Sequence, residues 1–394
     1  MKLTKTIERL TSLFVIILMI DPSDGILKLK MPLFVLLVLL LLIYYKNVSF
    51  KAILVFLIIY AICLSTNAIG FVRGVNTDLR FALGVYKGFT MTILLLWSNR
   101  LRFLEYLTFP TIIVSFIVLT IFILTKTIPE IGGIIYNFTN NEIIPIKIST
   151  RNFIGFEILS VFYLTSPLSI FVAGVFLQKL TKGESNKLGS LFIIACAISI
   201  LILSGTRMNI LSAIVIIGFI LIWRMWKTRY GKLLAGVITI FGLIGVMLII
   251  SKLLNDTGEQ SLEVKFTLAE AFNIQLSKDP WLLIFGEGPG ATFDSLGVRG
   301  KLAVQSELTY LDLIRWFGIP FTIIILLIYL YPIKIIYSKR KNLEYASVLI
   351  VAYFLYMVIA GSNPLLITST GMLALLIMYT YALNPYYENN NQEI

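Results

Sequence analysis

The sequence contains no histidine and only two cysteines, Cys63 and Cys196. Without histidine, a histidine general base is excluded and the commonest metal ligand is missing. Both cysteines lie inside apolar runs, where a small buried residue is a commoner role than a disulfide or a redox pair. The sequence therefore predicts neither a metal site nor a cofactor, and any acid–base chemistry must come from a carboxylate, a tyrosine or a lysine.

Charged residues are also scarce. Asp, Glu, Lys and Arg make up 14% of the chain, whereas 58% of the residues are hydrophobic and the mean hydropathy is +0.90. A soluble domain carries about 25% charged residues. Lipid offers no water to satisfy backbone groups, so long apolar runs are expected to be helices, and strand-like alternation is not apparent. The composition predicts an all-α, polytopic integral membrane protein.

The apolar runs predict about 12 transmembrane helices, because roughly 20 residues cross the hydrocarbon core of a bilayer. They fall near 10–20, 31–45, 51–69, 80–97, 106–125, 153–178, 188–204, 209–226, 233–253, 317–337, 344–360 and 365–383. The first run is expected to be a retained span, since Asp21-Pro22-Ser23-Asp24 is unlike the cleavage site of a signal peptide. Residues 1–394 are predicted to form a single transmembrane domain.

The distribution of Lys and Arg predicts the orientation. The net charge is +12, and the strongest basic clusters lie at 224–232 and 334–341. With both termini in the cytoplasm, the excess positive charge falls on the cytoplasmic side, as the positive-inside rule requires. The charge is thus a topology signal that calls for no nucleic acid. We expect a multi-pass protein of a bacterial inner membrane.

One polar interval, residues 254–316, interrupts the apolar pattern. Apolar residues from Leu262 to Leu276 recur at helical spacing, Asp279-Pro280 ends that helix, and the glycine-rich run 286–290 permits a tight turn. A second helix is predicted over Gln305–Phe317, leading into the next span. The interval is therefore predicted to be a large, partly helical periplasmic loop that covers an outer cavity.

Two arginines stand out on the predicted periplasmic side. Arg207 lies in the tight corner Ser204-Gly205-Thr206-Arg207, and Arg151 precedes the sixth predicted helix. Either could be an arginine that reaches from a helix end to the membrane interface. However, the positive-inside bias disfavours arginine on this side, and a planar guanidinium suits phosphate oxygens.

Other charged residues allow a structural and a functional interpretation. Glu157 and Lys87 lie in apolar runs, where charges usually face a cavity or pair with each other. Several arginines are each most simply solvated surface charges, but together they would make the outer cavity basic and suited to a lipid-linked diphosphate. These arginines are Arg73, Arg80, Arg299 and Arg315.

Taken together, these features resemble the O-antigen polymerase/ligase superfamily (Wzy and WaaL types). The resemblance rests on the helix start with Arg151, the Ser-Gly-x-Arg corner at 204–207, the Phe-Gly-x-Gly turn at 285–288 and a closing helix before Gly318-Ile319. It covers roughly residues 150–340. Members are polytopic, metal-independent, inverting glycosyltransferases whose donor is a glycan on undecaprenyl diphosphate at the periplasmic face.

The resemblance implies roles for individual residues. Arg151 and Arg207 match the arginines that engage the diphosphate. In ligases the closing helix carries a histidine at the position that corresponds to Glu307, so the departure favours a polymerase with Glu307 as the base and Glu157 or Asp312 in reserve. Tyr310 and Trp316 could stack against sugar rings, although packing in the core or at the interface is the commoner role for each. The substrate-binding set comprises Tyr310 with Arg73, Arg80, Glu157, Arg299, Asp312 and Arg315.

The expected partners are lipid-linked glycan donor and acceptor, the bilayer, a chain-length regulator and a flippase. A ligase that transfers the same glycan to another acceptor would share the fold and the arginines. A transporter or flippase is the third hypothesis, with Lys87 and Glu157 as coupling charges. Transporters usually contain internal repeats and broken helices at matching positions, and neither is evident in this sequence.

Overall fold

The computed structural model describes residues 2–45, 48, 50–139, 144–153, 156–184, 186–226, 229–237, 240, 242, 245, 260–298 and 300–388. This part of the chain is mostly helical, with two short antiparallel two-stranded sheets. The chain divides into two compact units. Unit 1 comprises Met1–Pro110, Ile143–Pro145 and Glu263–Ile394, and unit 2 comprises Thr111–Glu142 and Ile146–Leu262.

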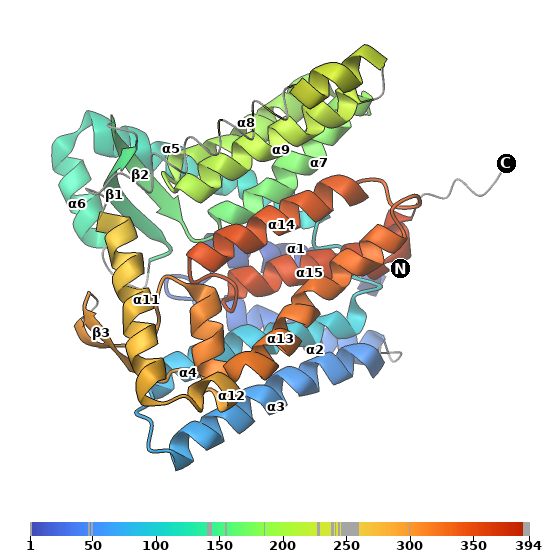
Figure 1. The fold of residues 1–394 in the computed structure, drawn as a ribbon. Coiled ribbons are helices and arrows are strands. Elements are labelled where there is room, and N and C mark those ends of the chain that lie inside the picture. The colour runs from blue at the N-terminus through green and yellow to red at the C-terminus, as the bar shows by residue number, and fades with distance from the viewer. Residues whose placement is uncertain are drawn as a thin grey trace. The chain divides into compact units, whose positions relative to one another are not determined.

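Unit 1 contains the N-terminal and C-terminal helices and most of the long polar interval (Figure 1). Its elements are α1 (Lys2–Ile20), α2 (Lys30–Tyr44), α3 (Phe50–Val72), α4 (Leu79–Thr90), η1 (Met91–Trp97), η2 (Glu105–Leu107), α11 (Gln260–Lys278, whose first residues belong to unit 2), α12 (Leu282–Phe285), β3 (Phe293–Gly297), β4 (Gly300–Ala303), α13 (Thr309–Ser338), α14 (Ala346–Ser362), α15 (Ser369–Leu383) and η4 (Pro385–Tyr387).

Helix α15 is the centre of unit 1. Every residue from Thr370 to Ala382 is buried, and the helix contacts α1, α4, η1, α13 and α14. A helix that is apolar on all sides is stable only where it is covered on all sides. The other helices of unit 1 are therefore organised around α15.

The two ends of unit 1 are defined by contacts between segments far apart in the sequence. At what we call the Arg315 end, the Lys30 Nζ donates to Ser369 Oγ (3.1 Å), and the Asp78 N–H donates to the Gly290 carbonyl (2.8 Å). At the Arg100 end, the Asn384 amide donates to the Leu101 carbonyl (2.9 Å).

Helix α13 is interrupted at Gly318, whose φ of 69° and ψ of 168° are not helical. Pro320, two residues later, has no N–H to donate to the carbonyl of Trp316. That carbonyl instead accepts a hydrogen bond from the Gly288 N–H (2.8 Å), and the Arg315 carbonyl accepts one from the Glu287 N–H (3.0 Å). The glycine-rich run 286–290 thus satisfies the backbone groups that the interruption sets free.

Glycine is required for this close approach. A Cβ at Gly286 would overlap the Trp316 carbonyl, and a Cβ at Gly318 would overlap the Ile284 carbonyl. On the other side of the turn, Gly70 of α3 leaves room for the Glu287 carbonyl. The turn is therefore held between α3 and the break in α13.

Unit 2 consists of a bundle of helices and a β-hairpin. Its elements are α5 (Thr108–Thr127, whose first residues belong to unit 1), α6 (Pro129–Thr139), β1 (Ile146–Phe153), β2 (Phe156–Tyr163), η3 (Ser166–Leu168), α7 (Ser169–Lys182), α8 (Lys187–Leu203) and α9 (Arg207–Met225). Helix α7 packs against both α8 and α9, and the hairpin contacts α6 and α8.

The hairpin contradicts the sequence-based prediction of a helix over 153–178. Residues 156–163 form strand β2, in which Phe156 is the register partner of Phe153 on β1, and α-helix begins only at α7. The run is rich in aromatic and β-branched residues, which suit a strand as well as a helix. Its partner β1 also alternates: Ile146 and Ile148 are buried, and Lys147 is exposed. Strand-like alternation is therefore present in this segment, contrary to the expectation from the sequence.

Several helices of the described part are long and apolar enough to cross a membrane, which indicates a membrane protein. Five reach spanning length: Ala52–Val72, Leu79–Trp97, Glu105–Thr127, Arg207–Met225 and Thr309–Ser338. Shorter apolar helices occupy Lys30–Tyr44, Lys187–Leu203, Ala346–Ser362 and Ser369–Leu383. The predicted span at 233–253 falls largely outside the described residues, so the count of twelve stays a prediction.

The contact between the glycine-rich turn and α13 can be tested by two alanine substitutions. Gly286→Ala and Gly297→Ala both force alanine into a positive φ (67° and 85°), but only Gly286 has backbone against it. We expect G297A to lower the unfolding free energy by about 1–2 kcal/mol. G286A should lower it by about 1–3 kcal/mol more, because of the overlap. Thermal unfolding in detergent measures both, and equal losses would contradict the packing described.

Candidate functional site

In unit 2, the corner between α8 and α9 is built from backbone contacts to the hairpin. The Ser160 hydroxyl of β2 donates to the Ser204 carbonyl (2.6 Å), and Asn209 Nδ2 donates to Ser204 Oγ (2.9 Å). Gly205 has a φ of +61°, and a Cβ there would overlap Ser160. Ser204 and Gly205 thus hold the corner against β2, and Asn209 fixes the Ser204 side chain.

This corner places Arg207 at the first position of α9, where the residue is half-buried. Position 151 lies on β1 and pairs with Ile158, so strand alternation puts it on the same face of the hairpin as Ser149 and Ser160. Positions 149 and 151 are two steps apart along the strand, about 7 Å. The structure therefore brings the positions of the two predicted arginines to the same part of unit 2. Arg151 lies on a strand, not at a helix start.

By strand alternation, position 157 belongs to the other face of the same hairpin. It pairs with Asn152, one position out of phase with residue 151. On that face Ile146, Ile148 and Val161 are buried. The expectation of a carboxylate within a membrane helix was wrong, because residue 157 belongs to β2, and strand register separates it from residue 151.

In unit 1, the guanidinium of Arg315 is buried, with 2% of the residue exposed. Its Nη1 donates to the Ala291 carbonyl (2.5 Å), and its Nη2 donates to the Val304 carbonyl (2.5 Å) and contacts Asp312 Oδ1 (3.4 Å). The cation also lies 4.5 Å from the centre of the Phe293 ring. Arg315 thus joins three residues of the long interval, Ala291, Phe293 and Val304, to α13.

Asp312 completes this buried group. Its Oδ2 accepts hydrogen bonds from the Ser306 N–H (2.8 Å) and the Ser306 hydroxyl (3.0 Å), and the residue is 2% exposed. A buried ion pair is tolerated only when its remaining donors and acceptors are satisfied. The Arg315–Asp312 pair meets this condition, with two carbonyls on the arginine and a serine on the aspartate.

Glu287, in the glycine-rich turn, is a second buried carboxylate that the sequence-based reasoning did not select. It is 5% exposed, and both carboxylate oxygens accept from Gln275 Nε2 (3.0 and 2.8 Å). Burial raises the pKa of Glu287, while Arg315, the Gln275 hydrogen bonds and Arg73 act in the opposite direction. A single acidic residue between glycines in a polar interval was the only available signal.

Among the residues that the structure describes, the predicted basic residues of unit 1 do not gather as a group of unpaired cations. Arg73 forms an ion pair with Asp279, and its Nη1 donates to the Gly286 carbonyl (3.2 Å). Arg80 is exposed near the start of α4, and Arg315 is paired with Asp312. Arg299 lies outside the described residues.

The remaining predicted residues lie where the polar interval enters α13. Glu307 is half-buried on the segment just before Thr309, the first residue of α13. The Tyr310 hydroxyl donates to the Met357 carbonyl (2.9 Å), and its ring packs against Gly361. Tyr310 therefore joins α13 to α14. Within the described residues, no group of three or more His, Cys, Asp or Glu side chains could hold a metal ion.

Comparison with protein-family models, with curated proteins and with solved structures gives no match for this chain.

The buried pair makes a prediction for stability. Arg315→Met should lower the unfolding free energy by about 3–5 kcal/mol, because it leaves Asp312 buried without a counter-ion and removes donors from two carbonyls. The control Arg80→Gln changes an exposed arginine and should stay within about 0.5 kcal/mol of the wild type. Chemical unfolding of the purified protein measures both, and equal stability of R315M and R80Q would contradict this structural role.

Glu287 makes a prediction for pH dependence. Since its pKa is raised in the folded protein, the folded state keeps its proton to a higher pH than the unfolded chain. The unfolding free energy should therefore fall as pH rises from the ordinary glutamate pKa through the raised one. Glu287→Gln should lack this decrease. The unfolding free energy of the variant, measured relative to that of the wild type, should therefore increase with pH across that window. Thermal unfolding between pH 4 and 7 measures it.

The exposed residue Glu263 provides the control, because Glu263→Gln removes a carboxylate from α11 without touching the turn. A stability difference between E287Q and wild type that is the same at every pH would contradict the prediction.

Proposed function

We propose that this chain is an inverting glycosyltransferase of the O-antigen polymerase type, which joins repeat units carried on undecaprenyl diphosphate. The observation that carries the proposal is the hairpin–corner contact of unit 2. It holds the positions of Arg151 and Arg207, distant in sequence, in one part of the unit through the Ser160–Ser204 hydrogen bond. Two arginines suit a diphosphate, since guanidinium groups bind phosphate oxygens in pairs of hydrogen bonds.

In the proposed reaction, a sugar hydroxyl of the incoming lipid-linked unit attacks the anomeric carbon of the polymer. A new carbon–oxygen bond forms with inversion while the bond to the diphosphate breaks, and the diphosphate keeps the electron pair. Arg151 and Arg207 stabilise the negative charge that develops on the leaving group. Glu307 accepts the proton of the hydroxyl. No metal or other cofactor takes part.

The polar interval has a supporting role in this proposal. Arg73, Arg80, Arg299 and Tyr310 are proposed to contact the substrate. The buried groups of Asp312 and Arg315 serve mainly to hold the segment that carries Glu307, because their polar atoms already bond within the protein.

We also propose that the Arg315 end of unit 1 faces the periplasm and the Arg100 end the cytoplasm, in the inner membrane of a bacterium. This topology keeps the twelve spans, both termini in the cytoplasm, and residues 254–316 as the periplasmic loop. It is supported by Thr4, near the N-terminus, and Asn384, near the C-terminus, which line the same cavity at the Arg100 end. Both ends of the chain thus approach the side that is proposed to face the cytoplasm.

A ligase is the second candidate function. It would use the same donor and the same arginines and would differ in the acceptor, a lipid or protein in place of a second repeat unit. Glu307, where ligases have histidine, favours the polymerase. A transporter that couples Lys87 and Glu157 is less well supported, because residue 157 lies on a β-strand.

The test of the proposed function is a gel of surface polysaccharide from a strain that lacks the gene. A lipid core bearing a single repeat unit is the expected result, since polymerisation would have failed. A bare core with long polymer still on undecaprenyl diphosphate would identify a ligase. An unchanged ladder would reject both activities for that glycan.

Complementation of this strain with variants tests the role of Arg207. Arg207→Ala should abolish the polysaccharide ladder, and Arg207→Lys should lower activity by about tenfold or more, because lysine keeps the charge but not the planar pair of donors. Arg224→Ala, at the other end of α9, is the matched control and should complement fully. A normal ladder with R207A, at equal protein in the membrane, would rule out the diphosphate role.

The same assay tests the proposed base. Glu307→Gln should slow polymerisation by about 10²-fold, near the lower limit for a general base, because a diphosphate leaves readily. Glu263→Gln is the control on α11. Unchanged polymerisation with E307Q would move the role of base to another carboxylate.

A further inference from the structure

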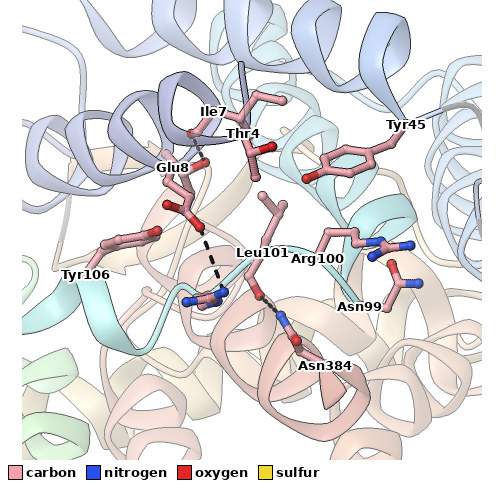
Figure 2. A pocket seen from close by; sticks show the side chains of 11 residues that line it. Thr4, Ile7, Glu8, Tyr45, Asn99, Arg100, Leu101, Tyr106 and Asn384 are labelled. Carbon is pink, nitrogen blue, oxygen red and sulfur yellow. Dashed lines mark hydrogen bonds and ion pairs between the residues drawn. The ribbon is translucent and has the colours of Figure 1, made fainter. Parts of the chain in front are cut away.

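At the Arg100 end of unit 1, a cavity of about 190 Å³ opens between the ends of several helices (Figure 2). Its walls come from the start of α1, the residue that follows α2, the connection after η1, and the residue that follows α15. None of these residues belongs to the site of the proposed function, so the cavity requires its own explanation.

Hydrogen bonds between the surrounding segments hold the walls in place. Asn384 Nδ2 donates to the Leu101 carbonyl (2.9 Å), and Trp97 Nε1 donates to the Tyr45 carbonyl (3.3 Å). The hydroxyls of Thr4 and Tyr44 are 3.0 Å apart. The cavity is therefore a formed feature of the fold, since four helix ends are connected around it.

The charges in the cavity are arranged unevenly. Arg102 lies 3.8 Å from both Glu8 and Glu105, and its guanidinium covers the ring of Tyr386 at 3.8 Å. By contrast, Arg100 lies 5.5 Å from the centre of the Tyr45 ring and forms no ion pair with any residue that the structure describes. One arginine of the cavity is thus compensated and the other is not.

The polar groups around Arg100 are suited to an anion. Figure 2 shows Tyr45, Asn99 and Arg100 on one side of the cavity, with Glu8 and Tyr106 on the opposite side. The hydroxyl of Tyr45 and the amide of Asn99 can each donate a hydrogen bond. A positive-inside bias explains the presence of Arg100 but does not explain a cavity lined by donors beside it.

The position of the cavity at the ends of the apolar helices indicates which kind of anion it would bind. Tyr44 (39% exposed), Tyr337 (58%) and Tyr386 (55%) lie at this end of unit 1. Tyrosine and tryptophan are enriched where a membrane protein crosses the headgroup layer. A basic cavity at that level, between helix ends, fits a phosphate-bearing headgroup.

We propose that this cavity binds a phosphate ester, with its phosphate beside Arg100 and within reach of the Tyr45 hydroxyl and the Asn99 amide. The ester is either the headgroup of an anionic phospholipid or a small soluble phosphate ester. The proposal depends on the membrane character of the chain but not on the glycosyltransferase reaction.

The experiment uses the full chain in nanodiscs of phosphatidylcholine, with or without phosphatidylglycerol. Bound lipid is counted by mass spectrometry after release from the disc. Wild-type protein should retain phosphatidylglycerol in preference to phosphatidylcholine, and Arg100→Gln should weaken that retention by about fivefold or more. Arg340→Gln is the matched control, because Arg340 is exposed at the same end over Tyr337 but does not line the cavity.

A second arm adds sn-glycerol 3-phosphate to the discs of phosphatidylcholine and measures the thermal stability of the protein. Stabilisation of the wild type but not of R100Q, without selective lipid retention, identifies a soluble ester as the ligand. Equal effects of R100Q and R340Q in the lipid arm would show unspecific surface attraction and overturn the proposal. The proposal is also overturned if neither ligand distinguishes R100Q from the wild type.

Discussion

A backbone carbonyl that is buried away from water needs a hydrogen-bond donor from within the protein. In α13 the break at Gly318 and the missing N–H of Pro320 deprive two carbonyls of their usual donors. The N–H groups of Glu287 and Gly288 replace them. The arrangement of the polar interval follows from this contact. The glycine-rich turn must reach the helix backbone, which explains its composition, and its fixed position in turn brings Glu287 into a buried environment.

The same principle operates in unit 2 on a smaller scale. The sharp corner before α9 exposes the Ser204 carbonyl at a helix end, and the Ser160 hydroxyl of the hairpin satisfies it. In both units, an irregular piece of backbone is held by a polar group from a distant segment. The arginines of interest lie next to these contacts, Arg315 beside the first and Arg207 beside the second. Their positions are thus consequences of how the chain satisfies its backbone.

Helices were predicted correctly from the sequence where a long apolar run could form only a helix. Helices α8, α9, α14 and α15 begin and end within a few residues of their predicted limits, and the amphipathic helix α11 lies over its predicted apolar positions. The prediction failed for residues 153–163, where a run of aromatic and β-branched residues allowed either helix or strand. Strand β2 is chosen because β1 and the corner before α9 provide its partners, and a partner distant in sequence leaves no local signal.

The sequence by itself determined the membrane class, most of the helices and the polar interval, because hydration and lipid act on each segment separately. Tertiary structure alone decided the surroundings of the charged residues. Arg315 and Asp279 are of residue types that usually lie on the surface. In the folded chain, however, Arg315 is buried against Asp312, and Asp279 pairs with Arg73. Whether a charge is solvated, paired or buried depends on which distant groups lie within a few ångströms, and only the folded chain brings those groups together.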